Sequence, residues 1–431
     1  MNDGIKVAIV GLGKVGMPLA ARIAARGHTV IGCDVNPEVV ATVNRGESPL
    51  AGEEGLDEAV RDAVRDGNLT AATGTTDAVR RSDVVVVIVP VLLTGDKQAD
   101  LSMMEAAASD VAAGLQKGAL VIFETTLPVG ATRNTLGPIL ERGSGLKAGA
   151  DFGLAFSPER VFSGRILRDL ATYPKIVGGI DDDSTERAAR FYEEGLGVEA
   201  ARVRDCETAE LSKLAELTYR DVNIAFANEL ATAAQRAGVD VLDVIAAANS
   251  QPFSHIHEPG VGVGGHCVPV NPWFLVNGLG PTPIARLARE TNDGMGREAA
   301  RLLDEALGGL KGRTVLILGL AYRGNVKEPY HSAAFLLNDA LKEAGARVLI
   351  HDPLFTNDEI AARGLEPVTL EPPPSVDAIV LQAAHDEYKT MDFAAFPGCR
   401  VVLDGRNVLS REDVEAKGLR YLGVGRQIAA R

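Results

Sequence analysis

Cysteine is scarce in this chain, and it has no long apolar runs. The four cysteines among 431 residues, Cys33, Cys206, Cys267 and Cys399, form neither a CxxC pair nor a His/Cys cluster with metal-ligand spacing. We therefore expect reduced thiols and no bound metal, as in a cytoplasmic protein. No apolar run is long enough to span a bilayer, and the N-terminus leads directly into a strand pattern, so we expect neither a membrane segment nor a signal peptide.

A surplus of basic residues is missing too. Lys and Arg number 44 against 58 Asp and Glu, and the formal net charge of −14 argues against a nucleic acid or a membrane surface as a partner. A phosphorylated ligand must then be held by local dipoles and a few basic side chains. A hydrophobic content of 46% is ordinary for a globular protein, and 431 residues are too many for one core, which predicts two or three domains.

The N-terminus carries a pattern typical of dinucleotide-binding proteins. An apolar run at 6–10 predicts a buried strand, which leads into a G-x-G-x-x-G loop at 11–16 and then into a helical pattern at 18–26. A second predicted strand at 29–33 ends at Asp34. Asp34 can bond a ribose 2′-hydroxyl and would repel a 2′-phosphate, which favours NAD over NADP.

The three glycines of this loop have separate expected roles. Gly11 makes the tight turn, Gly13 lets a pyrophosphate approach, and Gly16 lets helix and strand pack closely. The helix N-terminus supplies N–H groups and a positive dipole end for the pyrophosphate. The alternative is a glycine turn in some other α/β protein.

Three further apolar runs, at 84–89, 119–123 and 152–156, predict parallel strands. They end at Pro90, at Glu124-Thr125-Thr126 and at Ser157-Pro158-Glu159-Arg160. Because ligands bind at the carboxyl ends of parallel strands, Thr126 and Glu159 are candidate site residues by position alone.

Helical patterns replace the strand patterns in the middle of the chain. From about 207 to 249 apolar residues recur at spacings of three and four, and a second helical stretch runs from about 283 to 307. We expect the long Ala-rich helix near 211–247 to bridge domains and to bury one face against a second copy of the chain. We therefore predict a homodimer or a higher homo-oligomer.

A second α/β pattern follows the helices. An apolar run at 314–318 leads into a loop that starts at Gly319, and a run at 347–350 ends at His351-Asp352, as a degenerate echo of the N-terminal pattern. We expect it to bind a different nucleotide. The predicted fold class is α/β, with two Rossmann-like, doubly wound domains joined by a long central helical segment. The predicted domains are 1–206, 207–311 and 312–431.

A glycine-rich loop at 259–266 precedes Cys267. Its glycines Gly260, Gly262, Gly264 and Gly265 indicate tight turns and a close approach to another group. Backbone N–H groups of such loops often bind phosphate, and a cysteine at the rim can act as a nucleophile. The alternative is a tight turn beside a buried, inert cysteine.

Together these motifs resemble the UDP-glucose/GDP-mannose dehydrogenase family over nearly the whole chain. The resemblance rests on GLGKVGMPLA at 11–20, ETTLPVG at 124–130, SPERV at 157–161, ELSKL at 210–214, NELA at 228–231, GGHCVP at 264–269 and DGRNV at 404–408. It implies oxidation of the 6-hydroxymethyl group of a nucleotide sugar to a carboxylate with two NAD⁺. The SPERV and GGHC forms look like the branch that acts on UDP-ManNAc or UDP-GlcNAc.

The resemblance also implies roles for individual residues. Cys267 captures the aldehyde, and Lys213 stabilises oxyanion and thiolate charge. Glu159 and Thr126 hold and activate a water, and Asn271 stands at a further catalytic position. Taken alone, Lys213 is more typical of a solvated charge on a helix, and Glu159 of a surface carboxylate.

The implied binding residues form two sets. The cofactor set is Gly11, Gly13, Lys14, Val15, Gly16, Asp34, Pro90 and Thr126. The substrate set is Glu159, Arg160, Val161, Lys213, Asn223, Gly260, Gly264, Gly265, Tyr322, Arg323 and Arg406. For Arg406 the alternative is a structural ion pair.

The chain departs from the family pattern at three positions. Leu217 stands where the family has an Asn, Asn271 where it has an Asp, and Tyr330, with Lys327 nearby, where an Arg is usual. An amide can orient a water but cannot take its proton. A UDP-glucose 6-dehydrogenase, a two-electron nucleotide-sugar dehydrogenase and a non-catalytic nucleotide-sugar-binding protein therefore stay open as alternatives.

Overall fold

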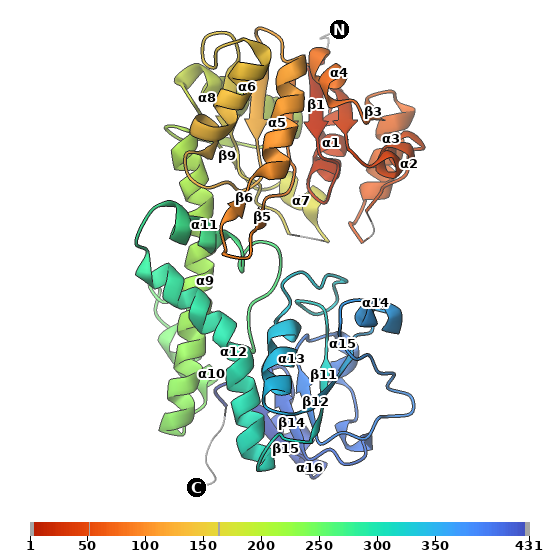
Figure 1. The fold of residues 1–431 in the computed structure, drawn as a ribbon, viewed down its shortest axis with the longest axis vertical. Coiled ribbons are helices and arrows are strands. Elements are labelled where there is room, and N and C mark those ends of the chain that lie inside the picture. Colours follow the sequence, from red (N-terminus) through yellow and green to blue (C-terminus); the bar gives the residue numbers. More distant parts are fainter. Residues whose placement is uncertain (1–3, 51, 163, 427–431) are drawn as a thin grey trace. The chain divides into compact units, whose positions relative to one another are not determined.

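The structure, a computed structural model, describes residues 4–50, 52–162 and 164–426 (Figure 1). Contacts within the chain define two compact units. The N-terminal unit comprises Met1–Glu216 and Trp273–Gly280, and the C-terminal unit comprises Leu217–Pro272 and Pro281–Arg431. Two helices contribute residues to both units, α9 (Cys206–Ala237) and α11 (Asn271–Gly278).

The N-terminal unit is built on an eight-stranded sheet with the order β10-β9-β8-β7-β4-β1-β2-β3. Neighbouring strands from β8 to β3 are parallel, whereas β9 runs antiparallel to β8. The strands are β1 (Lys6–Val10), β2 (Thr29–Cys33), β3 (Leu69–Ala72), β4 (Val84–Val87), β7 (Leu120–Phe123), β8 (Gly153–Phe156), β9 (Lys175–Gly179) and β10 (Ala200–Arg202). A separate antiparallel pair is formed by β5 (Leu92–Leu93) and β6 (Ala99–Asp100).

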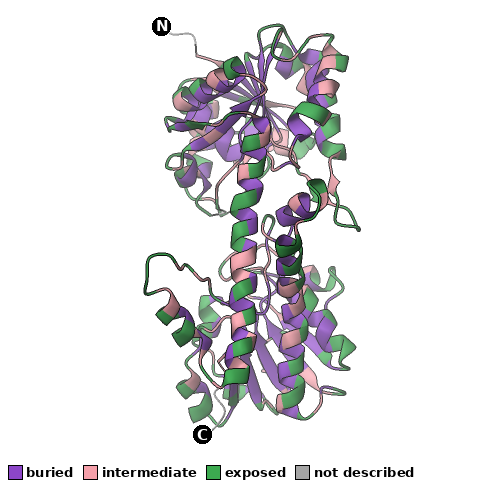
Figure 2. Ribbon diagram, turned by 90° about the vertical axis from the view of Figure 1, so that its left-hand side faces the viewer, coloured by how far each residue is buried: buried purple, intermediate pink, exposed green. Residues whose placement is uncertain are grey.

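Helices cover both faces of this sheet. They are α1 (Gly16–Ala24), α2 (Pro37–Asn44), α3 (Leu56–Arg65), α4 (Thr75–Arg80), α5 (Ser102–Gly114), the π-helix η1 (Thr132–Leu136), α6 (Gly137–Ser144), α7 (Ile166–Leu170) and α8 (Asp182–Leu196). Val7 and Ile9 of β1 belong to a core with α1, α3 and α8, whereas Ala8 and Val10 belong to a core with α4, α5 and α6. Both faces are buried, which is why these strands are apolar without alternation (Figure 2).

The C-terminal unit holds a five-stranded parallel sheet with the order β12-β11-β13-β14-β15. The strands are β11 (Thr314–Leu318), β12 (Arg347–His351), β13 (Ala378–Leu381), β14 (Val401–Asp404) and β15 (Arg420–Gly423). The helices are α10 (Val241–Ala248), α12 (Pro283–Leu307), α13 (Ala333–Glu343), α14 (Asn357–Ala361), α15 (Asp386–Lys389), the 3₁₀ helix η2 (Phe393–Ala395) and α16 (Arg411–Ala416). Its core includes residues of α9, α12 and α13 on one face of the sheet.

The predicted fold class, two doubly wound α/β domains with a long central helix, is confirmed. The helical region differs in one respect, because the helix expected near 211–247 ends at Ala237. Gly238 adopts a left-handed φ of +70°, and Asp240 then caps α10 by accepting a hydrogen bond from Leu242 N–H over 2.9 Å. A glycine in this conformation is a common helix terminator, and an aspartate is a strong N-cap.

Candidate functional site

The loop after β1 turns sharply at Gly11. The backbone φ is +97°, and Gly11 N–H donates to Cys33 O over 2.8 Å. A Cβ on Gly11 would lie 2.3 Å from Ile88 O. Glycine is therefore required where the chain leaves the strand, since any side chain would strike backbone and strain φ.

Gly13 and Gly16 differ in what surrounds them. A Cβ on Gly16 would lie 1.8 Å from Gly11 O, so α1 packs against the loop without room for a side chain, whereas a Cβ on Gly13 would meet nothing within 4 Å. Gly13 and Lys14 are exposed and Val15 is half-buried, just before α1. This open cradle fits a pyrophosphate, because backbone N–H groups and the positive end of the helix dipole lie there.

Asp34 follows β2 and is held by the loop after β1. Its Oδ2 accepts from Leu12 N–H over 3.0 Å, and its Oδ1 accepts from Asn36 N–H over 2.9 Å. The side chain is only half-buried, and each carboxylate oxygen keeps a further lone pair with which to accept a ribose hydroxyl. Beyond neighbouring strand ends, Pro90 is exposed and Thr126 is half-buried.

Two glutamates share one lysine beyond the ends of β7 and β8. Lys175 Nζ lies 3.2 Å from Glu124 Oε2 and 3.0 Å from Glu159 Oε2. The Tyr192 hydroxyl of α8 donates to Glu124 Oε1. Lys175 reaches this edge because it is the first residue of β9, which runs antiparallel to β8. Glu159, a predicted site residue, is therefore part of a buried cluster, which we call the Glu–Lys–Tyr cluster.

The pKa values of the two glutamates of this cluster are shifted in opposite directions. Burial raises the pKa of Glu124 to about 8, although the Lys175 ammonium opposes the rise. Burial acts on Glu159 as well, but Lys175 and hydrogen bonds from Glu124 and Arg160 N–H outweigh it and lower the Glu159 pKa. Burial would lower the pKa of Lys175, yet the two carboxylates raise it. These directions favour a proton on Glu124, with Glu159 as the carboxylate and Lys175 as the ammonium.

The other predicted residues of the N-terminal unit have different surroundings. Arg160 Nε pairs with Glu216 Oε2 of α9 over 3.1 Å, and Val161 packs against the core on one face of the sheet. Lys213, on α9, is 6% exposed, and no described residue forms a hydrogen bond or an ion pair with its ammonium. A lysine whose stem is buried while its ammonium has no protein partner is available to a ligand.

In the C-terminal unit, hydrogen bonds anchor the glycine-rich loop at several positions. The contacts are Gly260 N–H to Asn228 Oδ1 (2.9 Å), Val261 N–H to Gly405 O (3.1 Å), Arg406 Nη1 to Gly262 O (3.1 Å) and Gly265 N–H to Tyr330 O (2.9 Å). They tie the loop to α9, to the residues after β14 and to the loop that precedes α13. The backbone before Cys267 is thereby fixed in place.

Asn223 of α9 holds the start of the same loop region. Its amide accepts from His257 N–H over 2.8 Å and donates to His255 O over 2.7 Å. Further on, a Cβ on Gly264 would lie 2.7 Å from Tyr322 Cβ, and a Cβ on Gly265 would lie 3.2 Å from the Tyr322 ring. Close packing against Tyr322 therefore explains both glycines.

Cys267 is the only exposed cysteine of the four. Burial raises the pKa of Cys33 to about 12 and that of Cys399 to about 11, and it also raises the pKa of Cys206. Cys267 O accepts from Asn271 N–H over 2.8 Å in the turn that leads into α11, whose first residue, Asn271, is buried. Exposure makes Cys267 the thiol with access to a ligand.

The guanidinium of Arg406 donates to neutral oxygens. Nε donates to Gln382 O over 2.6 Å, Nη2 donates to Gln382 Oε1 over 2.8 Å, and Nη1 donates to Gly262 O. Burial lowers the Arg406 pKa to about 10, partly opposed by Asp404. The guanidinium is thus fixed in position while its charge stays available to an anion. Elsewhere in the C-terminal unit, the exposed Arg323 donates from Nε to the half-buried Tyr322 hydroxyl over 3.0 Å.

The second nucleotide-binding pattern has the same backbone turn as the first, but the aspartate after its second strand has different surroundings. Gly319 has a φ of +105°, and its N–H donates to His351 O over 2.8 Å, as Gly11 does to Cys33. Asp352 Oδ2 accepts from both Leu320 N–H and Ala321 N–H over 2.8 Å, and it contacts His385 Nε2 at 3.1 Å. Asp352 is 1% exposed and therefore cannot receive a ribose.

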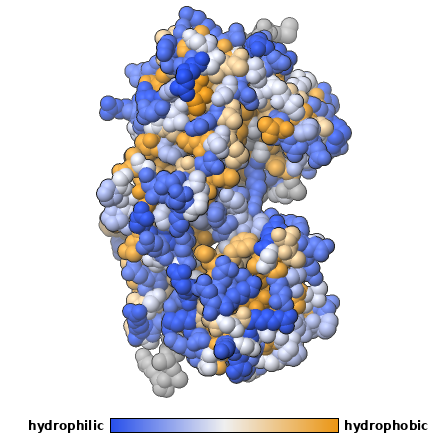
Figure 3. Space-filling view, in the orientation of Figure 1, coloured by the Kyte–Doolittle hydropathy of each residue, from blue (hydrophilic) through white to orange (hydrophobic). Residues whose placement is uncertain are grey.

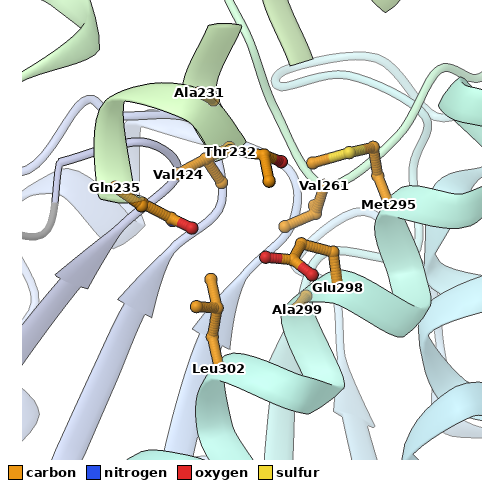
Figure 4. A pocket seen from close by; sticks show the side chains of 9 residues that line it. All are labelled: Ala231, Thr232, Gln235, Val261, Met295, Glu298, Ala299, Leu302 and Val424. Carbon is orange, nitrogen blue, oxygen red and sulfur yellow. The ribbon is translucent and has the colours of Figure 1, made fainter. Parts of the chain in front are cut away.

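One enclosed cavity of the C-terminal unit is too small for a ligand. Residues of α9 and α12 line it together with Val261 and Val424 (Figure 4). Its volume of about 10 Å³ is that of one water. A nucleotide sugar must therefore bind elsewhere.

Family comparisons agree with this geometry. In the UDP-glucose/GDP-mannose dehydrogenase family, the model of the NAD binding domain matches residues 5–195, that of the central domain matches 207–293, and that of the UDP binding domain matches 316–411. The chain belongs to this family. Both the family expectation and the choice of NAD as cofactor are therefore confirmed.

Individual relatives match over nearly their full length. A UDP-N-acetyl-D-mannosamine dehydrogenase of Pyrococcus horikoshii is 34% identical over 98% of this chain and 99% of its own. An NDP-N-acetyl-D-galactosaminuronic acid dehydrogenase of Ralstonia solanacearum is 35% identical over 95% and 97%. The solved structure of a UDP-glucose dehydrogenase of Pyrobaculum islandicum is 31% identical, with a TM-score of 0.86 and 98% of both chains covered.

The departures from the family pattern lie in ordered surroundings. Leu217 is buried on α9. Tyr330 stacks on the ring of His266, the residue before Cys267, with centroids 4.2 Å apart and an interplanar angle of 9°. Lys327 Nζ pairs with Glu359 Oε1 over 2.7 Å. Leu217 and Tyr330 thus pack locally, and Lys327 has a charge partner.

Lys175, Tyr192 and Glu124 were not predicted as site residues. A lysine at the start of the buried run Lys175–Gly179 was the available signal, because charged side chains seldom enter buried strands unpaired.

Among the described residues, no helix is both long and apolar enough to cross a membrane. Hydrophilic and hydrophobic residues are interspersed on the face shown in Figure 3.

Proposed function

We propose that the protein is an NAD-dependent nucleotide-sugar 6-dehydrogenase that acts on UDP-ManNAc or UDP-GlcNAc. It oxidises the C6 hydroxymethyl group by four electrons to a carboxylate. The observation that carries the proposal is Cys267, the exposed cysteine on an anchored glycine-rich loop in a chain of this family. The N-acetylhexosamine preference is supported by the names of the relatives from P. horikoshii and R. solanacearum.

The proposed chemistry proceeds through a thioester on Cys267. The glycine cradle would hold NAD⁺, which would supply the hydride acceptor for each of the two oxidations. The first oxidation converts the alcohol to an aldehyde, whose carbonyl carbon the Cys267 thiolate attacks to form a thiohemiacetal. The second oxidation leaves a thioester. Water then adds to the thioester carbon, and the C–S bond breaks with its electron pair returning to sulfur.

The overall reaction consumes one alcohol, two NAD⁺ and one water, and it yields one carboxylate, two NADH and three protons. Lys213 is proposed to stabilise the alkoxide and oxyanion charges and the thiolate. Its largely buried side chain, whose ammonium forms no hydrogen bond or ion pair with any described residue, supports this role. Glu159 and Thr126 are proposed to hold the hydrolytic water, and Asn271 to orient it through its amide.

The nucleotide end of the substrate is proposed to bind the C-terminal unit. Arg406 supports this assignment, because its guanidinium is oriented by neutral oxygens and is free of a direct carboxylate contact among the described residues. Such an arginine suits a diphosphate. Gly260, Gly264, Gly265, Tyr322 and Arg323 are proposed to line the same region, and Asn223 to support it through the loop.

A two-electron dehydrogenase is the second candidate. Asn271 favours it, since an amide cannot accept the proton of the hydrolytic water. The stoichiometry of NADH per sugar separates the two candidates. A UDP-glucose 6-dehydrogenase and a non-catalytic binding protein are further outcomes of the same test.

The decisive experiment supplies excess NAD⁺ and limiting UDP-ManNAc, UDP-GlcNAc or UDP-glucose, and it counts NADH per sugar consumed. We expect two NADH with one of the N-acetylhexosamine substrates, and a C267A variant should abolish carboxylate formation. C399A is the matched control and should behave as wild type, because Cys399 is partly buried and its pKa is raised. One NADH per sugar would refute the four-electron reaction, and none with any sugar would refute the enzyme assignment.

A further inference from the structure

The Glu–Lys–Tyr cluster has an odd balance of charge for a buried site. The side chains of Glu124, Glu159 and Lys175 are 0%, 12% and 5% exposed. Two carboxylates and one ammonium would leave one negative charge uncompensated in a region with little water. Burying an unpaired charge costs far more than binding one proton, so a single proton on one glutamate neutralises the cluster.

The hydrogen bonds show which glutamate holds that proton. Glu159 accepts from Lys175 Nζ over 3.0 Å and from Arg160 N–H over 2.7 Å, so donors already satisfy it as a carboxylate. Glu124 accepts from Tyr192 through Oε1, whereas its buried Oε2 accepts no hydrogen bond from the described residues. Glu124 and Glu159 share a side-chain hydrogen bond, so a proton on Glu124 makes it the donor and Glu159 the acceptor. The arrangement is an acid–carboxylate pair with a fixed direction.

We propose that Glu124, Lys175 and Tyr192 are positioning residues that keep Glu159 as the ionised, oriented member of a proton-sharing pair. The inference rests on the proposed function in one respect, namely that Glu159 receives the proton of the hydrolytic water. Glu124 and Lys175 each supply one hydrogen bond to Glu159, in addition to the one from Arg160 N–H. Tyr192 fixes Glu124 from the opposite side, and its ring lies 4.7 Å from the Lys175 ammonium.

A pH dependence follows from the state of Glu124. The titratable and charged groups around Glu159 are Glu124 after β7, Lys175 of β9, Tyr192 of α8 and its neighbour Arg160. Because the pKa of Glu124 is raised to about 8, its proton is present at neutral pH and is lost as pH rises through 8. Glu159 then loses a donor and faces a second negative charge. Thioester hydrolysis should therefore fall along an alkaline limb.

Variants of Glu124 test this limb. Glu124→Gln keeps an N–H donor that cannot ionise, so the limb near pH 8 should move upward by at least one pH unit. Glu124→Ala removes the donor, and its kcat at pH 7 should fall at least tenfold below that of the Gln variant. Glu141→Gln, at a surface glutamate paired with Lys147, is the matched control and should leave the profile unchanged. An unmoved limb in Glu124→Gln would overturn the proposal.

Variants of Lys175 test the orientation of Glu159. In Lys175→Met, both oxidations should proceed but hydrolysis should slow, so the sugar should accumulate as an adduct on Cys267, measurable by mass spectrometry of the quenched enzyme. Lys175→Arg should restore hydrolysis, because it keeps a cation between the carboxylates. A structural role alone would lower both oxidations and hydrolysis together, and that result would refute the positioning role.

Infrared spectroscopy of the protein without substrate separates this inference from the proposed function. In the difference spectrum between wild type and Glu124→Gln, the carbonyl stretch of a protonated carboxyl group should be present at pH 7 and should disappear near pH 8. If the band is present but no sugar is oxidised, the pair stands and the enzyme assignment fails. If turnover occurs but this band is missing, the enzyme assignment stands and the pair is refuted.

Discussion

Replacing Gly13 or Gly16 by alanine should affect different properties of the N-terminal unit. The two positions lie three residues apart in one loop, and each substitution adds only a methyl group. The added Cβ of Gly16→Ala would lie 1.8 Å from Gly11 O and 3.0 Å from the Gly11 carbonyl carbon, so backbone must move. The added Cβ of Gly13→Ala would meet no atom within 4 Å, and the φ of Gly13 lies outside the left-handed region.

The expected magnitudes follow from these surroundings. Overpacking against backbone costs about 1–3 kcal/mol, and roughly 2–4 °C of melting temperature is lost per kcal/mol in a domain of 150–250 residues. Gly16→Ala should therefore lower the Tm by about 2–12 °C. Gly13→Ala should leave the Tm unchanged or raise it slightly, because alanine restricts the unfolded chain by about 0.4–1 kcal/mol. Its methyl group occupies the open cradle and should weaken NAD⁺ binding at least about tenfold, or ~1.4 kcal/mol.

The assays are thermal unfolding followed by circular dichroism and NAD⁺ binding followed by calorimetry. Each variant is compared with wild type in both. Gly13→Ala should lose affinity at an unchanged Tm, whereas Gly16→Ala should lose stability. Wild-type affinity in Gly13→Ala would refute the passage of the pyrophosphate beside Gly13. Wild-type stability in Gly16→Ala would refute the close contact between α1 and the loop.

Two further predictions concern the C-terminal unit. Arg289 is 1% exposed and pairs with the buried Asp221 over 2.6 Å. Arg289→Ala leaves that carboxylate unpaired, so it should lower the free energy of unfolding, measured by urea denaturation, by about 3–5 kcal/mol. A loss below about 1 kcal/mol would contradict a stabilising role of the pair. Phe226 of α9 is 48% exposed, and we expect a second copy of the chain to cover it. Phe226→Glu should therefore reduce the molecular mass of the oligomer measured by light scattering. A monomeric wild type would contradict this prediction.

The sequence was sufficient wherever structure depends on neighbours in the chain. The predicted strands at 6–10, 29–33 and 314–318 have the observed bounds, because an apolar run between turn signals specifies a strand buried on both faces. β9 was not predicted. It starts with Lys175 and ends with two glycines, so its composition is atypical for a strand.

The Glu–Lys–Tyr cluster could not be predicted from the sequence for a related reason. Lys175 contacts Glu124 only because β9 adds to the sheet in the antiparallel direction, which reverses the end at which its first residue lies. Sequence spacing carries no information about that direction. Glu159 was predicted because it follows a parallel strand, and ligands bind beyond the carboxyl ends of such strands. This rule does not point to Lys175, which lies at the start of its strand.

The two nucleotide-binding patterns show how one backbone device is used in two ways. In both, a glycine with positive φ follows the first strand, and an acid after the second strand accepts N–H groups from the glycine loop. Asp34 remains half-buried with lone pairs to spare, whereas Asp352 receives two N–H groups and contacts His385 with almost no exposed surface. Only Asp34 can accept hydrogen bonds from a ribose. A nucleotide bound by the C-terminal unit must therefore be recognised by other groups, and Arg406, already oriented by neutral oxygens, has the charge and the geometry for that task.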